Sequence, residues 1–421
     1  MGTLLIVGII LIAYAATSAL LDRWGVTSAI AFVTAGLLVG GAGWFHAGAA
    51  GEPARLVTEL ALVLLLFSDS ARLDLRALRS HLAWPSRLLL IGLPLTILLG
   101  TGAGLLLFPG IGLAGAFLLS TMLCPTDAAL GQRVVEDPAV PARVRQALDV
   151  ESGLNDGLAV PFFLVALDIS LATLHDSLPS AVVHNAAEQI GWGLVAGIGS
   201  GVVAGLLFRR SEQLGRLHGQ WVQLFTIAAA LTGYAGAVTL GGSGFIAAFV
   251  GGGAFGLVSR EHGLRATYFT EETGNLLAAV TWIGFGAVAF RTVWPEISWR
   301  VLAYAILSLT VVRMLPVAVA FIGTRARWQT AVFIGWFGPR GLATVVFGLI
   351  ALEHGIPNAN PVLTTVVVTV ALSVVLHGLT AVPLIAAYRR WYDRARAAGP
   401  TGAEAQETPL PRTRRRPASA A

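Results

Sequence analysis

Two short segments of this chain combine carboxylates with hydroxyl groups inside otherwise apolar sequence. One is Pro125-Thr126-Asp127, and the other is Glu151-Ser152-Gly153-Leu154-Asn155-Asp156. In a helix, Ser152 and Asp156 are four residues apart and lie on one face. Carboxylate and hydroxyl oxygens are the ligands that a hard cation prefers. The spacing therefore predicts an oxygen-lined cation site in which Asp127 and Asp156 supply the negative charge.

The depth of Asp156 adds a second substrate to this prediction. Asp156 lies about ten residues into an apolar run over 146–170, so at about 1.5 Å per residue it is near the centre of a bilayer core of about 30 Å. An ionisable residue at that depth is functional by default. A proton and a cation compete for one carboxylate, and Thr126 would complete the oxygen shell with its hydroxyl or carbonyl. The predicted chemistry is exchange of a cation for a proton.

The composition describes the elements that must hold these residues. Hydrophobic residues make up 55% of the 421 residues and charged residues 12%, whereas an average soluble chain has about 25% charged. This composition excludes a soluble enzyme and indicates contact with a lipid bilayer. The basic residues are all arginines in scattered short loops, which argues against nucleic-acid binding. A single cysteine and the absence of cysteine or histidine clusters predict no zinc or redox cofactor.

Long apolar runs predict an all-α polytopic membrane protein with about thirteen transmembrane helices. The runs lie at 3–21, 26–42, 55–70, 85–108, 111–132, 146–170, 184–208, 220–240, 243–258, 272–291, 299–323, 327–352 and 361–388. Arginines concentrate in every second loop, and the other loops hold only Arg55, Arg291 and Arg300. By the positive-inside rule we expect an inner-membrane protein with its N-terminus outside and its C-terminus in the cytoplasm.

Two of these runs are interrupted in corresponding positions. The fifth run breaks at Cys124-Pro125-Thr126-Asp127, and the twelfth, seven runs later, breaks at Gly338-Pro339-Arg340-Gly341. A division into six, one and six helices places the two sixes in opposite orientations, as in an inverted repeat. Backbone that is freed by proline and glycine is tolerated only where protein or a water-filled cavity satisfies it. The paired breaks therefore predict two broken, crossing helices at the substrate site of a secondary transporter.

Three further features carry charge. Glu151 needs a partner inside the membrane, and Arg313 and Arg340 are the candidates. Asp69, near the end of its run, either lines an access funnel for ions or marks a solvated helix end. The segment 399–421 has the proline- and arginine-rich composition of a disordered tail.

Taken together, these motifs resemble the sodium/proton antiporters of the monovalent cation:proton antiporter superfamily, in the branch of NhaP-type antiporters and animal sodium/proton exchangers. The matching pieces are Pro125-Thr126-Asp127, the segment Glu151 to Asp156, Gly244-Phe245-Ile246-Ala247-Ala248-Phe249-Val250, Arg313 and Gly338-Pro339-Arg340-Gly341. The resemblance implies a homodimer whose transmembrane domain covers 1–398. Runs 1 to 3 and 7 to 10 would form the dimerisation part, and runs 4 to 6 and 11 to 13 the ion-transporting core.

The resemblance also implies roles for single residues. Asp156 would carry the ion or the proton, and Asp127 with Ser152 and Thr126 would help to ligate the cation. Glu151 would pair with Arg313, and Arg340 would line the site. The pair Asn155-Asp156 resembles the electroneutral branch, because the electrogenic branch has two aspartates there. Many relatives place a glutamate nearer to the position of Ser68, whereas this chain has Asp69 one residue later.

Three other functions remain open at this stage. A potassium/proton antiporter would use the same residues, because the cation is selected by cavity geometry. An intramembrane aspartyl protease also places two aspartates on adjacent helices, but its Gly-x-Gly-Asp segment is absent and the paired breaks would have no role. A sodium-coupled symporter of an organic solute would share the architecture. The sequence favours the antiporter of sodium or lithium.

Overall fold

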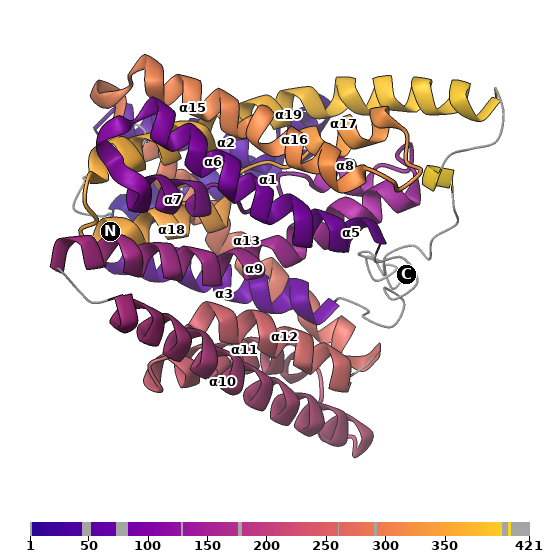
Figure 1. Cartoon of the computed structure of the whole chain (residues 1–421). Coiled ribbons are helices and arrows are strands. Elements are labelled where there is room, and N and C mark those ends of the chain that lie inside the picture. The colour runs from indigo at the N-terminus through magenta and orange to yellow at the C-terminus, as the bar shows by residue number, and fades with distance from the viewer. Residues whose placement is uncertain are drawn as a thin grey trace.

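In the computed structural model the chain folds into a bundle of α-helices (Figure 1). The structure describes residues 2–43, 52–72, 83–127, 129–175, 179–259, 261–289, 293–397 and 403–405, and within these ranges it contains no strand. Seven helices are long and apolar enough to cross a membrane, and four shorter helices are also apolar. The predicted all-α polytopic fold is confirmed.

Each predicted run of the N-terminal half coincides with one helix or with one interrupted helix. These are α1 (Gly2–Arg23), α2 (Ser28–Gly41), α3 (Glu52–Arg72), α5 (Ala83–Arg87) with α6 (Leu93–Leu107), α7 (Gly112–Met122) with α8 (Gln132–Glu136), and α9 (Ala142–His175). A π-helical turn at Leu88–Gly92 joins α5 to α6. With 21 residues α3 is of spanning length, although it is not among the seven most apolar spans.

The C-terminal half follows the predicted runs in the same way. Its helices are α10 (Pro179–Gln213), α11 (Gln220–Thr239), α12 (Gly244–Ser259), α13 (Glu261–Gly284), α15 (Trp299–Leu309) with α16 (Val311–Phe321), α17 (Trp328–Trp336) with α18 (Leu342–Glu353), and α19 (Ala359–Ala397). The interruption between α15 and α16 was not predicted. There Thr310 has φ −112° and ψ −93°, and its hydroxyl donates to the carbonyl of Ile306 (2.6 Å), a local bond that competes with the helical ladder.

Proline explains where the two predicted breaks fall. Pro125 and Pro339 have no backbone N–H, and each disfavours helical geometry at the preceding residue. Accordingly α7 ends at Met122, three residues before Pro125, and α17 ends at Trp336, three residues before Pro339. Each break leaves a non-helical segment, 123–127 or 337–341, in the middle of a span.

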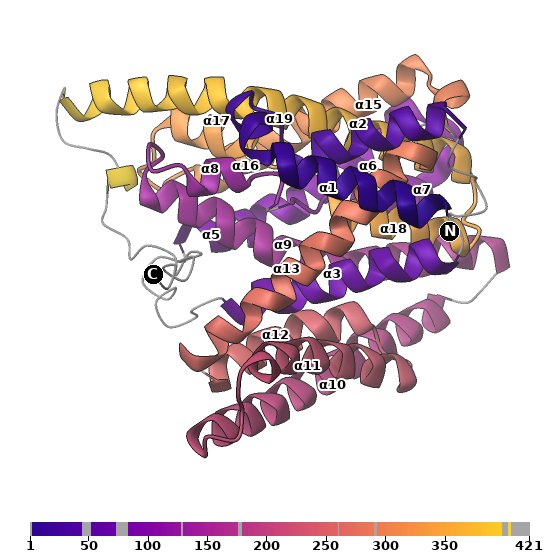
Figure 2. The same cartoon turned by 180° about the vertical axis from the view of Figure 1, so that it is seen from behind.

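Small residues bring the helices around α12 close together. A Cβ added to Gly252 or Gly256 would overlap the carbonyl oxygen of Phe67 or Ala71 in α3, and one added to Gly201 of α10 would overlap the carbonyl oxygen of Gly251. The glycine-rich stretch of α12 thus permits backbone-to-backbone packing, as small residues do in membrane helices. In Figures 1 and 2, α10, α11 and α12 lie together on the side of the bundle opposite α15 and α19.

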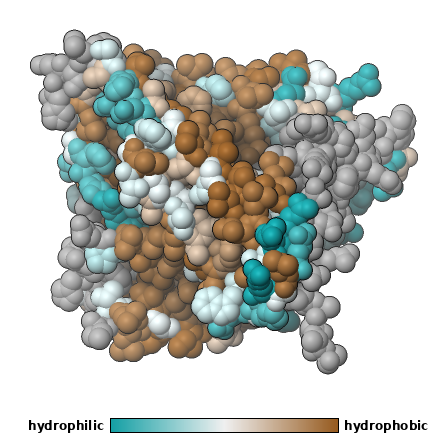
Figure 3. Space-filling model, turned by 90° about the horizontal axis from the view of Figure 1, so that it is seen from below, coloured by the Kyte–Doolittle hydropathy of each residue, from teal (hydrophilic) through white to brown (hydrophobic). Residues whose placement is uncertain are grey.

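The outer surface of this helix group is apolar across its middle. Figure 3 shows a hydrophobic band with hydrophilic patches toward both ends of the bundle. The large exposed apolar side chains of α10 include Leu194, Val195, Ile198, Val203, Leu206 and Leu207. Such a band is the surface that a bilayer covers, so the chain is a multi-pass membrane protein.

The first and the last long helix have their outer termini at opposite ends of the bundle. Helix α1 begins at one end and α19 finishes at the other (Figures 1 and 2), as an odd number of spans requires. Most of the segment 399–421 lies outside the described residues. Within it, residues 403–405 form a 3₁₀ turn, where the buried Glu404 accepts hydrogen bonds from the backbone N–H of Arg327 (2.6 Å) and the hydroxyl of Thr330 (2.9 Å). The expected disorder therefore does not extend to these three residues.

Candidate functional site

The two breaks meet each other inside the bundle. The backbone N–H of Asp127 donates to the carbonyl of Pro339 (2.9 Å), so the segments 123–127 and 337–341 are joined directly. Unpaired backbone groups in a dry interior are costly, and each break must find partners outside its own helix. The side chains that supply these partners define the site.

The guanidinium of Arg340 donates hydrogen bonds to the carbonyl groups of the first break. Its Nη1 donates to the carbonyls of Cys124 (3.1 Å) and Pro125 (3.2 Å), and its Nη2 donates to the carbonyl of Ser308 (3.4 Å) beside the α15–α16 interruption. The side chain is completely buried. A cation at the C-terminal end of α7 is electrostatically favourable, because the last carbonyls of a helix carry partial negative charge.

The carboxylate of Asp127 accepts a hydrogen bond from the backbone directly after the second break. Its Oδ2 accepts from the backbone N–H of Leu342 (2.9 Å), the first residue of α18, and its Oδ1 accepts from Leu130 (3.0 Å). A carboxylate at the N-terminus of α18 is favourable for the same reason as the cation at α7. Gly341 makes the approach feasible, since a Cβ at this position would overlap the carboxylate of Asp127.

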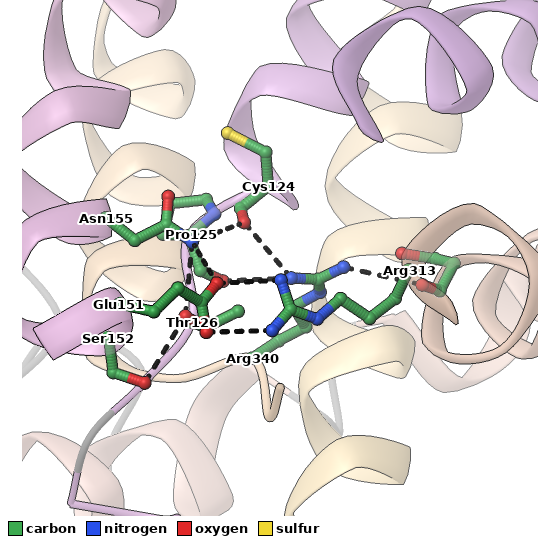
Figure 4. A network of polar contacts seen from close by, with 9 residues as sticks. Cys124, Pro125, Thr126, Glu151, Ser152, Asn155, Arg313 and Arg340 are labelled. Carbon is green, nitrogen blue, oxygen red and sulfur yellow. Dashed lines mark hydrogen bonds and ion pairs between the residues drawn. The ribbon is translucent and has the colours of Figure 1, made fainter. Parts of the chain in front are cut away.

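Glu151 and Arg313 form a direct ion pair between α9 and α16. Two parallel hydrogen bonds of 2.7 Å and 2.8 Å join the guanidinium to the carboxylate, and the residues are 1% and 3% exposed. Of the two partners considered for Glu151, the structure thus brings Arg313 to it. Arg340 instead contacts backbone carbonyls, as Figure 4 shows together with the surrounding network.

Polar side chains of α9 extend this network to the first break. The side-chain amide of Asn155 donates to the hydroxyl of Thr126 (3.1 Å), with longer contacts to the carbonyl of Cys124 and to Glu151 (both 3.4 Å). The hydroxyl of Thr126 lies 3.5 Å from that of Ser152. One cluster therefore gathers three residues predicted for the site, Thr126, Ser152 and Asn155, together with Glu151 of the predicted ion pair (Figure 4).

One carboxylate oxygen of Asp156 lacks a protein partner among the described residues. Its Oδ1 is buried and has no hydrogen-bond partner among the described residues, and the same holds for Oδ1 of Asn155. Nearby carboxylates act on Asp156 electrostatically, those of Asp127, Asp69 and Glu151. Buried oxygens in a native protein almost always have a partner, so these two oxygens are available to an ion, a proton or water.

Asp69 lies beside α9 rather than at a remote helix end. The residue is half-buried in α3, and its Cβ is 3.7 Å from the position that a Cβ on Gly153 would take. Its side chain thus faces the same stretch of α9 that carries Ser152 and Asp156. Within the described ranges no group of three or more histidine, cysteine or carboxylate side chains could hold a metal ion.

Sequence reasoning missed the support that α19 gives to the second break. The hydroxyl of Ser373 accepts from the backbone N–H of Arg340 (2.7 Å), and the buried ring of His377 contacts the carbonyl of Trp336. The available signal was the spacing of Ser373 and His377, which are four residues apart and share one face of a helix.

Comparison with known proteins identifies the fold. The family model of the sodium/hydrogen exchanger, transmembrane, matches residues 4–387. The structure of the sodium proton antiporter MjNhaP1 from Methanocaldococcus jannaschii at pH 8 superposes with a TM-score of 0.74 at 18% identity, covering 91% of this chain and 99% of that one. The family and the fold are those of a membrane transporter.

The curated relatives of this chain are longer proteins. The K(+)/H(+) antiporter NhaP2 of Shewanella sp. (strain ANA-3) is 27% identical over 388 residues, and the K(+)/H(+) antiporter NhaP of Alkalimonas amylolytica is 24% identical over 390. The matches cover 86% and 91% of this chain, which spans only 64% and 66% of the relatives' own length. The Na(+)/H(+) antiporter of Schizosaccharomyces pombe is 25% identical over 320 residues, 67% of each chain. With a family model matched over nearly its whole length and both signature breaks in place, the chain belongs to the sodium/hydrogen exchanger transmembrane family.

Proposed function

We propose that this protein exchanges a monovalent cation for protons across the membrane by alternating access. The observation that carries the proposal is the unpartnered oxygen of Asp156, which is buried beside two crossing broken helices and near three other carboxylates. A site of this kind is neutralised by a cation or by a proton. Only the neutralised site can move through an apolar barrier at low cost.

The oxygens of the cluster suit a small cation. Asp156 and Asp127 supply charge, and the hydroxyls of Ser152 and Thr126 with the amide oxygen of Asn155 supply neutral ligands. Both carboxylate oxygens of Asp127 already accept one backbone N–H each. Because a carboxylate oxygen has two lone pairs, Asp127 can still face a cation while it holds α18.

The buried pair of Glu151 and Arg313 fixes the frame around the ligands. Arg313 pairs with Glu151 through two hydrogen bonds, and Asn155 adds no further charge. Asp156 would then be the group that binds the cation and the proton in turn, and exchange of one cation for one proton moves no net charge. Asp69, at the side of α9, would guide the cation toward Asp156.

The identity of the cation is open between two candidates. Sodium or lithium is suggested by the resemblance of the motifs to those of sodium/proton antiporters. Potassium is favoured by a separate observation, since the two bacterial relatives named above are K(+)/H(+) antiporters. We propose sodium or lithium as the first substrate to test and potassium as the alternative.

The test uses purified protein in proteoliposomes with a pH-sensitive dye. Adding sodium, lithium or potassium outside should move protons, and the order of their apparent affinities identifies the substrate. Asp156→Asn should abolish exchange, because an amide cannot bind and release a proton. Asp168→Asn, on the outer part of the same helix, is the matched control and should keep it. Robust exchange by Asp156→Asn would contradict the proposed mechanism.

Stoichiometry requires a separate measurement. We expect the exchange rate to be independent of membrane potential, which otherwise contributes about 2.3 kcal/mol per charge per 100 mV. The potential is set with potassium and valinomycin after potassium has been tested as a substrate. A rate or end point that shifts with the imposed potential would contradict one-for-one exchange and leave antiport itself intact.

We further propose the assembly and orientation that the family resemblance implies. Helices α1–α3 and α10–α13 would form the dimerisation part of a homodimer, and α5–α9 with α15–α19 the moving core, with the N-terminus outside a cell membrane. Light scattering in detergent measures the dimer. Labelling of single cysteines placed before α1 and after α19, in a Cys124→Ser background, determines the orientation.

A further inference from the structure

The backbone groups of the second break have identifiable partners on two sides. On the side of the first break, Asp127 pairs with Pro339 and Leu342. On the other side, two backbone groups turn toward α19: the N–H of Arg340, which donates to the hydroxyl of Ser373 (2.7 Å), and the carbonyl of Trp336, which lies 2.8 Å from Nε2 of His377. One turn of α19 therefore holds both ends of the break.

The ring of His377 connects these two contacts. Its Nδ1 is 3.2 Å from the hydroxyl of Ser373 and 2.9 Å from the carbonyl of the same residue. We assign the ring proton to Nε2, because Nε2–H then donates to Trp336 while Nδ1 accepts from the hydroxyl of Ser373. Either tautomer leaves one bare ring nitrogen beside a carbonyl oxygen, Nδ1 beside Ser373 (2.9 Å) or Nε2 beside Trp336 (2.8 Å). We choose the first because the hydroxyl of Ser373, which accepts from Arg340, then has an acceptor for its own proton.

This assignment gives a continuous chain of hydrogen bonds. It runs from the N–H of Arg340 through the hydroxyl of Ser373 and the ring of His377 to the carbonyl of Trp336. Each group in it is buried and each donates or accepts in one direction. Trp336 adds a second attachment, since its indole Nε1 donates to the hydroxyl of Thr380 (3.0 Å), also on α19, and its ring lies 5.4 Å from that of His377.

We propose that His377, with Ser373, is a positioning residue of the transporter that fixes the backbone of the break at 337–341. The backbone of Arg340 is held by Ser373, and its guanidinium reaches the carbonyls of Cys124 and Pro125 on the first break. The position of α19 is thereby transmitted to the segment that carries Thr126 and Asp127. His377 touches no transported ion in this arrangement.

The test measures the apparent KM for the cation in proteoliposomes for four variants. His377→Leu removes both ring contacts, and His377→Asn keeps only the reach toward Ser373. His377→Gln places an amide N–H at the distance of Nε2 and keeps the bond to Trp336. We expect the Leu and Asn variants and Ser373→Ala to raise KM about fivefold, the factor that corresponds to one ordinary hydrogen bond, and Gln to restore it.

Two controls separate positioning from loss of folded protein. Thr369→Val removes a buried hydroxyl of α19 that bonds within its own helix (Thr365, 2.6 Å) and should leave KM unchanged. A role in stability alone would lower the yield or the melting temperature without changing KM. Unchanged KM in both His377→Leu and Ser373→Ala, or equal KM in the Gln and Leu variants, would overturn the proposal. If His377→Leu does not fold, Ser373→Ala and His377→Gln decide the outcome.

Different results would contradict the role of His377 and the proposed antiport. Exchange by the wild-type protein with variants that match it contradicts the role of His377 alone. Absence of cation-dependent proton movement in the wild type contradicts the antiport proposal instead.

Discussion

The two breaks differ in the backbone groups that they expose and in the helix that receives them. The carbonyls of Cys124 and Pro125 in the first break accept from the guanidinium of Arg340, whereas the backbone N–H of Leu342, directly after the second break, donates to the carboxylate of Asp127. Each break carries the charge that the other one needs. This reciprocal arrangement follows from the opposite partial charges at helix ends, and it ties the two broken helices into one unit.

The surroundings of the two breaks also differ. The first break faces α9, whose Asn155 and Ser152 contact Thr126, and it lies beside the unpartnered oxygen of Asp156. The second break faces α19, whose Ser373 and His377 contact backbone groups of Arg340 and Trp336. One break therefore borders the proposed cation site, and the other is anchored to α19. Four experiments test this difference, and they are ordered here from the largest expected effect to the smallest.

Breaking the ion pair between Glu151 and Arg313 should have the largest effect on stability. Glu151→Ala or Arg313→Ala strands a buried charge, and each should lower the free energy of unfolding by about 3–5 kcal/mol, whereas the double substitution should cost less than the sum. Thermal stability of the three variants in detergent measures the coupling. Strictly additive losses would show that the pair does not interact in the folded protein.

Removing the guanidinium should disconnect the first break from the second. Arg340→Met leaves the carbonyl of Pro125 without its side-chain donor, and we expect a loss of about 3 kcal/mol, the upper value for a hydrogen bond to a charged group. The control is Arg133→Met. Arg133 pairs with Asp22 (3.0 Å) at a largely exposed site, and its removal should cost less than about 1 kcal/mol. Equal losses in the two variants would mean that the buried contacts of Arg340 add little.

Gly341→Ala tests the close approach of the two breaks. The new methyl group would overlap the carboxylate of Asp127, so the contact with α18 must loosen at a cost of about 2 kcal/mol. Gly348→Ala in the same helix is the matched control, since its Cβ would have its nearest neighbour at 3.6 Å. That substitution should be neutral or stabilising by about 0.5–1 kcal/mol. A neutral Gly341→Ala would show that the helices have room to separate.

Asp127→Asn should have the smallest effect on stability. The amide oxygen can still accept one of the two backbone N–H groups, from Leu342 or Leu130, so we expect a loss of about 1 kcal/mol in the melting assay. Asparagine has nearly the same shape as aspartate but no charge. The result therefore shows how much of the contribution of Asp127 depends on its negative charge, for comparison with Arg340. A loss as large as that of Arg340→Met would mean that the negative charge itself holds α18.

Much of this architecture could be predicted from the sequence, because membrane spans and proline breaks have strong local signals. Apolar runs and the paired segments at Pro125 and Pro339 located every span and both breaks. The interruption at Thr310 was missed because a single threonine hydroxyl has no distinctive pattern. The same limit applies to the α19 contacts: a hydrogen bond between Ser373 and a backbone amide depends on how helices pack, and helix packing leaves no periodic trace in one sequence.

The partner of Glu151 illustrates the boundary between the two kinds of information. Two arginines were available to it in the sequence, and charge balance alone allowed either. The structure separates them by geometry, since Arg313 meets the carboxylate with two parallel bonds while Arg340 is directed to carbonyls. Composition predicts that a buried charge has a partner, whereas the choice of partner needs coordinates.

Cys124 lies where a thiol-reactive dye could report on opening of the first break. It is the only cysteine in the sequence, it is 1% exposed, and its thiol donates to the carbonyl of Thr121 (3.2 Å) at the start of the first break. A thiol-reactive dye added to the unmodified protein can label one position only, and it reaches that position only when water enters between the broken helices. The labelling rate therefore records how often the crossing opens, and comparing rates with and without substrate cations would time its opening without any engineered site.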